Sequence, residues 1–452
     1  MTDVCVIGAG LAGSEAAWQL AERGHKVLLC EMRPENTTPA HQTGYAAEMV
    51  CSNSFKNDDP CSATGILKAE MERLGSIILA TARETSVPAG LSLAVDRNLF
   101  AGLITERLQK HGNIEWKTAL ATEPPIAFGI PTIIASGPLT ADPLALWISE
   151  TFNESCLYFY DAIAPIVEKD SIDPSIAFPA SRYGKRTPDF LNCPLNKEQY
   201  ETFVDVLLAA PRAPLHDLEA RYFEACLPIE VMAERGRDTL RYGPMKPVGL
   251  TDPKTGGQPY AVVQLRQDSI AGDLFNLVGF QTRLAWGAQA EVFRLIPGIG
   301  NAVFSRFGSI HRNTYISAPR LLDATLAVKN RPDLPGLYFA GQISGVEGYM
   351  ESAATGLAAA IAVDRHIRSL PPLEFPGQTM IGAMLHYLAN AAPVNFTPIN
   401  AMIGVLPDLP KGVLDVKEIK KRGGKGGLKA AKREALREIA LAAIKSFESV
   451  VR

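Results

Sequence analysis

Residues 4–13 read Val4-Cys5-Val6-Ile7-Gly8-Ala9-Gly10-Leu11-Ala12-Gly13, a short apolar run followed by three spaced glycines. A helical stretch rich in small residues follows at 14–23, and a second apolar run at 27–30 ends on Glu31. Strand, glycine turn, helix, strand and acid in this order are typical of a βαβ unit that binds a dinucleotide. The stretch therefore predicts an α/β fold with a nucleotide-binding turn at its N-terminal end.

Each residue of this pattern has a physical role. Gly8 allows the tight turn, Gly10 lets the backbone approach a pyrophosphate, and Gly13 lets the helix lie close to the strand. The helix N-terminus offers unpaired N–H groups to the diphosphate. Glu31 is placed to accept hydrogen bonds from an adenosine ribose, which favours FAD or NAD(H) over NADP, although Arg33 weakens this distinction. The alternative is a turn that only packs a βαβ unit.

Composition limits the possible classes of protein. The chain has 452 residues, of which 47% are hydrophobic and 21% charged, so we expect two or three globular domains. It has no apolar run of about 18 residues and no room for a signal peptide before the first strand, so we expect no membrane span and a cytoplasmic location. The seven cysteines are scattered and never lie with histidine at zinc spacing, which predicts neither a disulfide framework nor a metal site.

After the first βαβ unit, a stretch with predicted helices and strands precedes a middle region of different composition. We expect irregular structure at 34–60, helices at 65–81 and 99–111, and strands at 92–95 and 132–134. From about 140 to 320, aromatic residues and prolines increase and the alternation of strand and helix weakens. This middle region is predicted to be an inserted substrate domain.

A second strand, glycine loop and helix follow at 337–341, 342–349 and 350–366. The loop contains Gly341, Gln342, Glu347 and Gly348. A second such turn would form the other wall of an FAD site, and the alternative is a second packing βα unit. We therefore expect a Rossmann-like FAD-binding domain with a parallel sheet at 1–95 and 322–410, an inserted α+β domain at 96–321 that partly returns to it, and a basic helical tail at 411–452.

Three further groups of residues could carry chemistry. Cys51 lies in a polar loop next to Ser52, Asn53 and Ser54, and Cys226 stands two residues before Pro228, yet composition alone does not separate either from a packed thiol. His311-Arg312-Asn313-Thr314-Tyr315 could form a wall for a planar heteroaromatic ligand or an ordinary surface turn. The tail cations Lys420, Lys421, Arg422 and Lys425, beside the flexible Gly423-Gly424 and Gly426-Gly427 pairs, suit a phosphate backbone or a solvated helix face.

The whole chain resembles the folate- and FAD-dependent tRNA (uracil-5-)-methyltransferases. The resemblance runs in order from the start of the chain to about residue 410, and the tail resembles the family only loosely. The resembling segments are 8–15, 38–41, 50–54, 88–97, 182–184, 191–194, 223–228, 242–250, 261–267, 278–282, 311–315 and 340–356.

The resemblance implies a specific activity. The family methylates carbon 5 of a uridine in the T-loop of tRNA. The carbon comes from 5,10-methylenetetrahydrofolate, and NADH or NADPH reduces the flavin. A thiolate adds to carbon 6 of the uracil, because carbon 5 alone is a poor nucleophile.

The resemblance also implies roles for particular residues. We expect Cys226 to attack carbon 6 and Cys51 to act as acid, base or protecting group, with the reverse assignment open. His311 is expected to stack on the folate pterin. Gln342 stands where many related folds have Asp, so its assignment is less direct than that of Glu31. The expected FAD-binding residues are Gly8, Ala9, Gly10, Leu11, Ala12, Gly13, Glu31, Arg33, Gly341, Gln342, Glu347 and Gly348.

Three other functions are compatible with parts of this sequence. A tRNA wobble-uridine carboxymethylaminomethylation flavoprotein resembles the chain in both glycine segments, but that family is longer and has an added C-terminal helical domain. A plain NAD(P)H-flavin oxidoreductase would need neither a thiol near uracil nor a basic tail. An RNA-binding protein stabilised by FAD would need no catalysis.

Overall fold

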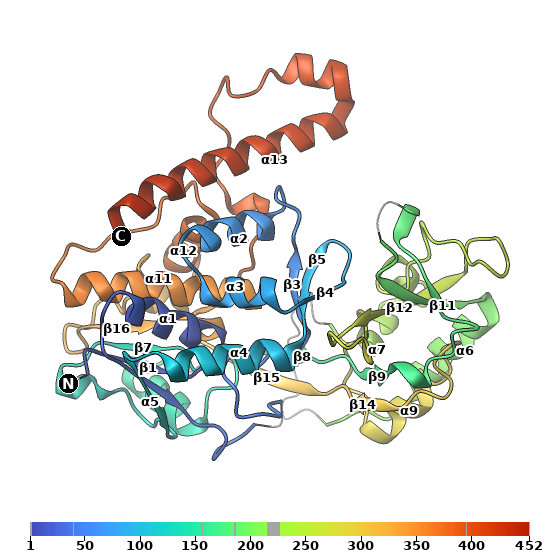
Figure 1. Ribbon diagram of the computed structural model, residues 1–452, viewed down its shortest axis with the longest axis horizontal. Coiled ribbons are helices and arrows are strands. Elements are labelled where there is room, and N and C mark those ends of the chain that lie inside the picture. The colour runs from blue at the N-terminus through green and yellow to red at the C-terminus, as the bar shows by residue number, and fades with distance from the viewer. Residues whose placement is uncertain are drawn as a thin grey trace.

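A five-stranded parallel sheet forms the centre of the first structural unit (Figure 1). The computed structural model describes residues 2–38, 40–154, 157–184, 187–214, 227–394 and 396–451. The strand order is β16-β7-β1-β2-β6, with neighbours in parallel register. The strands are β1 (Val4–Ile7), β2 (Val27–Glu31), β6 (Ile114–Thr118), β7 (Thr132–Ile134) and β16 (Leu337–Phe339). The predicted α/β class and parallel sheet are confirmed.

Helices cover both faces of this sheet, which is why β1 and β7 are buried along their whole length. On one side α1 (Leu11–Glu22) packs against α3 (Ile77–Glu84), α4 (Arg97–Lys110) and α11 (Tyr349–Ile367). On the other side lies α5 (Asp142–Phe152), seen below the sheet in Figure 1. The N-termini of α1 and α11 directly follow the two glycine turns.

A second unit is built on a six-stranded antiparallel sheet in the order β10-β11-β12-β13-β9-β14. Its own hydrophobic core includes Phe203, Phe280 and Phe293. Its elements are β9 (Ile166–Glu168), β10 (Phe178–Pro179), β11 (Phe190–Leu195), α6 (Lys197–Ala209), α7 (Ile229–Glu234), α8 (Thr239–Tyr242), β12 (Ala261–Gln267), β13 (Leu274–Leu277), α9 (Trp286–Phe293) and β14 (Phe304–Arg306).

Two antiparallel strands connect the units: β8 (Leu157–Ala162) leads outward and β15 (Ile310–Tyr315) leads back (Figure 1). Within the range 96–321 that was expected for the insertion, α4, β6, β7 and α5 belong to the core of the first unit. This part of the range returns to the first unit because β7 pairs with β1 on one side and with β16 on the other. We therefore propose that the seam runs along β8 and β15 and not at residues 95 and 322.

Two local expectations were wrong. The helix expected at 65–81 is two helices, α2 (Ala63–Arg73) and α3, because Gly75 takes a φ of +74° and Ser76 caps α3 by accepting the Leu79 N–H. The region 34–60, expected to be irregular, contains β3 (Ser54–Asn57). This strand pairs with β5 (Ser92–Val95), which also pairs with β4 (Ser86–Val87).

The tail forms α13 (Val416–Val451), interrupted at Gly424, which has a φ of +60°. In Figure 1 the chain reverses at this point, and the longer part of α13 returns along the first unit near α2 and α12 (Met380–Asn390). Where the chain re-enters the first unit after β15, it forms one more short helix, α10 (Ala318–Leu321). The predicted helical tail is confirmed. The two glycine pairs, which were expected to be flexible, lie within α13, and Gly424 forms its kink.

A buried carboxylate fixes α12 to α2. Glu70 is fully buried on α2 and accepts the N–H groups of Met380 at 2.6 Å and Ile381 at 2.9 Å, at the N-terminus of α12. Burial raises the pKa of Glu70 to about 8, although the two backbone N–H groups oppose the rise. The carboxyl is therefore protonated more readily in the folded protein than in the unfolded chain.

We expect Glu70→Gln to gain stability relative to the parent protein as the pH rises from about 4.5 to about 8. Below this range Glu70 is protonated in both states, and its stabilising contribution is complete. Within it, the unfolded chain releases a proton that the folded protein keeps, so the parent loses stability that the amide does not lose. Urea unfolding at pH 5 and pH 8 measures the effect, and exposed Glu72→Gln on the same helix is the control. An identical pH dependence in parent and Glu70→Gln would contradict the prediction.

Candidate active site

The first glycine turn has the tight geometry that its sequence predicts. Gly8 has a φ of +97°, and a Cβ on it would lie 2.6 Å from the Ala135 oxygen. A Cβ on Gly13 would lie 1.8 Å from the Gly8 oxygen. Gly10 is the N-cap of α1, lines a cavity, and has nothing within 4 Å of its Cβ position. Two glycines therefore permit close packing, and the third leaves open space in front of a helix N-terminus.

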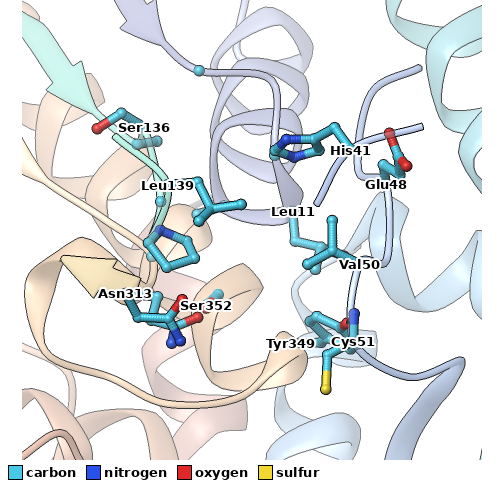
Figure 2. Close-up of a pocket in the computed structure, with 18 of the residues that line it drawn as sticks. Leu11, His41, Glu48, Val50, Cys51, Ser136, Leu139, Asn313, Tyr349 and Ser352 are labelled. Carbon is cyan, nitrogen blue, oxygen red and sulfur yellow. Dashed lines mark hydrogen bonds between the residues drawn. The ribbon is translucent and has the colours of Figure 1, made fainter. Parts of the chain in front are cut away.

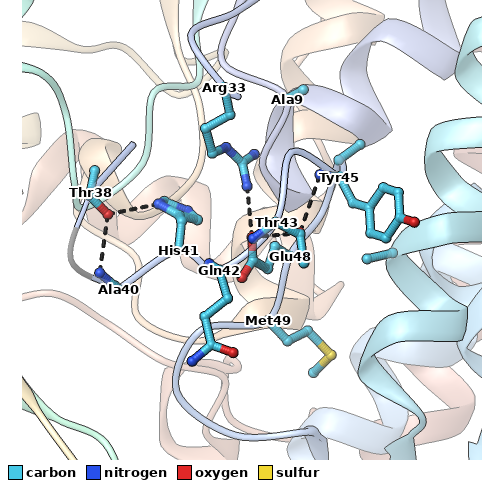
Figure 3. A network of polar contacts seen from close by, with 12 residues as sticks. Ala9, Arg33, Thr38, Ala40, His41, Gln42, Thr43, Tyr45, Glu48 and Met49 are labelled. Atoms are coloured by element: carbon cyan, nitrogen blue, oxygen red, sulfur yellow. Dashed lines mark hydrogen bonds and ion pairs between the residues drawn. The ribbon is translucent and has the colours of Figure 1, made fainter. Parts of the chain in front are cut away.

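The acid at the end of β2, Glu31, belongs to a buried ionic network, of which Figure 3 shows Arg33 and Glu48. The Ala9 N–H donates to Glu31 at 2.7 Å, and the Arg33 Nε–H donates to Glu31 at 2.8 Å. Burial by itself would raise the pKa of Glu31, but Arg33 and the Ala9 N–H outweigh it and hold this pKa below its ordinary value. Arg33 also donates to Glu48 at 3.1 Å. Glu31 is thus an anion that still has a free lone pair and lines the cavity.

His41 stands beside this network, and its Nδ1 lies 2.8 Å from the Thr38 hydroxyl (Figure 3). Burial, followed by the charge of Arg33, lowers the pKa of His41 to about 4. The imidazole is therefore neutral near pH 7 and lines the cavity as a polar, uncharged group.

The second glycine segment supplies the opposite wall. Gly341 has a φ of +81°, and a Cβ there would lie 2.8 Å from the Ala12 Cβ. Gln342 begins the short 3-10 turn η5 (Gln342–Ser344), and Glu347 and Gly348 precede α11. The two glycine segments, far apart in the sequence, therefore face one common cavity.

Cys51 lines the same cavity, where Figure 2 shows it next to Tyr349. Its N–H donates to the Tyr349 hydroxyl oxygen at 2.7 Å, and the Ser52 N–H donates to the same oxygen at 3.2 Å. The Cys51 thiol lies 3.7 Å from the Ala162 oxygen, at the end of β8. Burial, and then the neighbouring Cys51, raises the pKa of Tyr349, so its phenol stays neutral.

Two buried arginines, Arg97 and Arg266, and the half-buried Arg306 interact electrostatically with Cys51. Arg97 donates to Asp268 at 3.1 Å and to the Met49 oxygen at 3.1 Å. Burial disfavours the charged form of Arg97 and by itself would lower its pKa. The negative charge of Asp268 outweighs burial, so the pKa of Arg97 is raised. Burial lowers the pKa of Arg266 to about 10 and also lowers that of Arg306. The surroundings of the thiol are therefore rich in positive charge among the residues described.

The cavity has a volume of about 320 Å³, in the range of about 300–1,000 Å³ that is usual for ligand sites. It runs from the acid at the end of β2 to the Cys51 loop, and it takes in the turn after β7 (Figure 2). Its polar lining outside the glycine turns includes Arg33, His41, Glu48, Cys51, Ser52, Ser54, Lys56, Ser136, Gln281, Asn313, Tyr349 and Ser352.

The structure brings most of the predicted site residues together. Of the twelve expected FAD-binding residues, all except Ala9 and Gly13 line the cavity, and those two shape the turn behind it. Cys226 lies outside the described residues. The backbone of His311 lies in β15, and that of the tail residues Lys420, Lys421, Arg422 and Lys425 lies in α13, while their side chains are outside the description.

Several cavity residues were not predicted as site residues. They are His41, Glu48, Lys56 and Tyr349, whereas Asn313 belongs to the stretch 311–315 that was predicted as a possible ligand wall. Sequence signals could have indicated three of them: His41 and Tyr349 lie in resembling segments, and Lys56 follows Cys51 closely in the sequence. Glu48 gives no such signal, because its role depends on its contact with Arg33.

Two further features concern the described residues as a whole. No group of three or more His, Cys, Asp or Glu residues among them is arranged to hold a metal ion. None of the helices within the described part of the chain is long and apolar enough to cross a bilayer.

Fold and cavity together define a two-turn dinucleotide-binding α/β protein with an inserted antiparallel domain. Known proteins agree with this class. The chain matches the family described as Glucose inhibited division protein A over residues 3–371. It is also similar to the structure of Aquifex aeolicus GidA in the form II crystal, with a TM-score of 0.68 at 16% identity, covering 99% of this chain and 73% of that chain. At this identity the likeness concerns the fold alone.

Closer relatives carry a more specific name. The chain is 54% identical to the Methylenetetrahydrofolate--tRNA-(uracil-5-)-methyltransferase TrmFO of Desulforudis audaxviator, over 90% of this chain and 92% of that protein. It is 52% identical to the protein of the same name from Bacillus subtilis, over 92% of this chain and 94% of that one. The chain belongs to the TrmFO family, and the resemblance inferred from the sequence is confirmed.

We expect Gly13→Ala and Gly10→Ala to have different effects on the fold. The new methyl group at position 13 would overlap the Gly8 oxygen, so α1 must shift, at a cost of about 1–3 kcal/mol or more. At position 10 the methyl group enters open space, so the stability of the ligand-free protein should not change. Thermal melting of both ligand-free variants tests this difference. Equal melting temperatures would show that α1 does not depend on the close approach at Gly13.

Proposed function

We propose that the chain transfers the methylene group of 5,10-methylenetetrahydrofolate to carbon 5 of the T-loop uridine in tRNA and reduces it to a methyl group. The reductant is NADH or NADPH, the prosthetic group is FAD, and the activity is cytoplasmic, where tRNA resides. The observation that carries the proposal is the single cavity in which both glycine turns and Cys51 meet. The names of relatives at 51–54% identity support the same activity.

The cavity fits FAD by its shape and by the chemistry of its wall. The space in front of Gly10 and the N-terminus of α1 would receive the pyrophosphate. Glu31 would accept hydrogen bonds from the ribose, and Gly341 and Gln342 would hold the flavin end of the molecule. When bound, FAD supplies the electron transfer that no side chain of this cavity can perform.

The two cysteines carry the covalent chemistry in this proposal. The Cys226 thiolate attacks carbon 6 of the uracil, and the sulfur–carbon bond makes carbon 5 nucleophilic. Cys51 acts as acid, base or protecting group, and the opposite assignment of the two cysteines is the alternative within this mechanism. The target uridine must leave its stack in the T-loop to reach either thiol.

The remaining predicted residues would bind the substrates. His311 would stack on the folate pterin, from the strand that joins the two units. Lys420, Lys421, Arg422 and Lys425 would contact tRNA phosphates from the two sides of the interruption of α13 at Gly424.

The related wobble-uridine modification is not favoured. The GidA structures share the fold, but this chain covers only 73% and 78% of the two GidA chains. The relatives with the same length carry the methyltransferase name.

We expect Cys226→Ala to abolish methyl transfer and to leave the bound yellow flavin in place. The protein is incubated with T-loop uridine tRNA, labelled methylenetetrahydrofolate and NADH or NADPH, and label on uracil carbon 5 is measured. Full activity of this variant would eliminate Cys226 as the nucleophile. If the parent retains RNA without label, the binding-protein alternative gains support, and flavin turnover without RNA binding would favour the oxidoreductase.

We expect Glu31→Ala to bind FAD about tenfold or more weakly, because a charge-assisted hydrogen bond to the ribose is lost. Dialysis against flavin-free buffer, followed by absorbance, measures the retained FAD. Exposed Glu106→Ala, in α4, is the control. Unchanged flavin content in Glu31→Ala would mean that other residues hold the adenosine ribose.

A further inference from the structure

A cluster of three charged side chains lies at the Cys51 end of the cavity. Lys56 from β3 and Glu347 from the loop before α11 both line the cavity. The Lys56 ammonium lies 3.0 Å from Glu351 Oε1 and 3.5 Å from Glu347 Oε2. One ammonium therefore faces two carboxylates from α11 and the loop before it.

Both carboxylates are deeply buried. Glu351 is 0% exposed, and its Oε1 also accepts the Ala401 N–H at 3.0 Å. Its Oε2 is buried without a hydrogen-bond partner among the residues described. Glu347 is 9% exposed. Burial and the charge of Glu351 raise the pKa of Glu347, and Lys56 reduces the rise only in part.

Further charged residues interact with this cluster. Lys68 on α2 is 1% exposed and donates to the Asn57 oxygen at 2.8 Å. Burial lowers its pKa to about 8, while Asp58 and Glu351 oppose the shift and Arg83 and Lys56 add to it. Asp58 pairs with Arg83 at the surface.

The backbone around the cluster is adapted to it. Gly348 has a φ of +113°, and a Cβ there would lie 2.2 Å from Glu351 Oε2 and 2.5 Å from the Lys56 Nζ. Lys56 itself has a φ of +62°, which is uncommon for a residue with a side chain. Strained backbone of this kind occurs preferentially at functional sites. The ion pair therefore occupies space that an ordinary residue at position 348 would fill.

We propose that Glu347 exchanges a proton with the reactants in the cavity, and that Lys56, held by Glu351, returns the proton to Glu347. This inference rests on the proposed methyl transfer. In that reaction uridine, methylenetetrahydrofolate, NAD(P)H and one proton give 5-methyluridine, tetrahydrofolate and NAD(P)⁺. A proton donor is therefore needed in the cavity.

The proton transfer balances within the chain. The carboxyl O–H bond of Glu347 breaks, the proton bonds to a basic nitrogen or oxygen of a reactant, and the electron pair stays on the carboxylate. The Lys56 ammonium then gives a proton to Glu347. The Lys56 side chain is 36% exposed, so its amine regains a proton from water. Glu347 is the catalytic residue in this scheme, and Lys56 and Glu351 are positioning residues.

Two variants should move the pH profile of methyl transfer in opposite directions. The rate falls as the pH rises and Glu347 loses its proton. Glu351→Gln removes a negative charge, so the alkaline limb should move to lower pH, whereas Lys56→Met removes a positive charge and should move it to higher pH. We expect shifts of about one unit or more, as is usual for charges at this distance. Lys56→Arg keeps the positive charge, so the alkaline limb should stay where it is in the parent, but the rate should fall because a guanidinium does not return a proton to Glu347. Exposed Lys110→Met is the matched control.

A second measurement does not depend on turnover. In the flavin-free protein, infrared titration of carboxyl groups should show a signal that Glu347→Gln removes and that the two variants shift in the same opposite directions. Unshifted profiles and signals, or shifts of one sign in both variants, would overturn the proposal. If the parent transfers no label to uridine, the proposed function fails, and the infrared titration still decides whether Lys56 and Glu351 control the proton of Glu347.

Discussion

The site depends on the close approach of backbone around the first turn of α1. A Cβ on Gly13 would overlap the Gly8 oxygen, and a Cβ on Gly356 would lie 2.1 Å from the Ala12 oxygen. A Cβ on Gly341 would lie 2.8 Å from the Ala12 Cβ. Because these three positions carry no side chain, α1 lies against β1 on one side and α11 on the other. The two glycine segments thereby form opposite walls of one cavity.

The position of Cys51 depends on both structural units. Tyr349 of the first unit accepts two N–H groups of the Cys51 loop. From the second unit, the Gln267 oxygen accepts a hydrogen bond from Asn53 at 3.0 Å, and Asp268 holds Arg97, which in turn donates to the loop. The thiol is therefore placed correctly only when both cores are folded and in contact. Such a location, at the seam between two units, is common for ligand sites.

The parts of this structure that were predicted from the sequence are those set by local pattern. The first βαβ unit and the second glycine segment were predicted because a strand, a glycine turn and a helix each leave a signal within a few residues. The strand β3 was missed because it depends on pairing with a distant segment, and the seam proposed along β8 and β15 depends on distant pairing as well. The break at Gly75 has a local cause, a glycine of positive φ followed by the capping Ser76, which the prediction of one continuous helix overlooked. The ion pair of Lys56 and Glu351 was missed because it joins distant segments.

The tail illustrates how a distant contact changes the meaning of a charged sequence. Ala440, Ile444 and Phe447 are buried, at the spacing of one helical face. Phe447 packs on Phe375 with ring centroids 4.2 Å apart, and Glu448 pairs with Arg73 of α2 at 2.5 Å. This face fixes the second part of α13 to the first unit.

Other faces of that helix carry cations such as Lys429 and Lys432. Their side chains are exposed, while the helix itself is packed against the first unit. Cations on a freely moving segment would lose conformational entropy when they bind phosphates, whereas cations on a docked helix have already lost part of it in folding. The apolar face of the tail therefore positions the exposed lysines of this helix, which follow the four cations proposed to contact tRNA. It keeps these lysines in a fixed relation to the unit that contains the cavity.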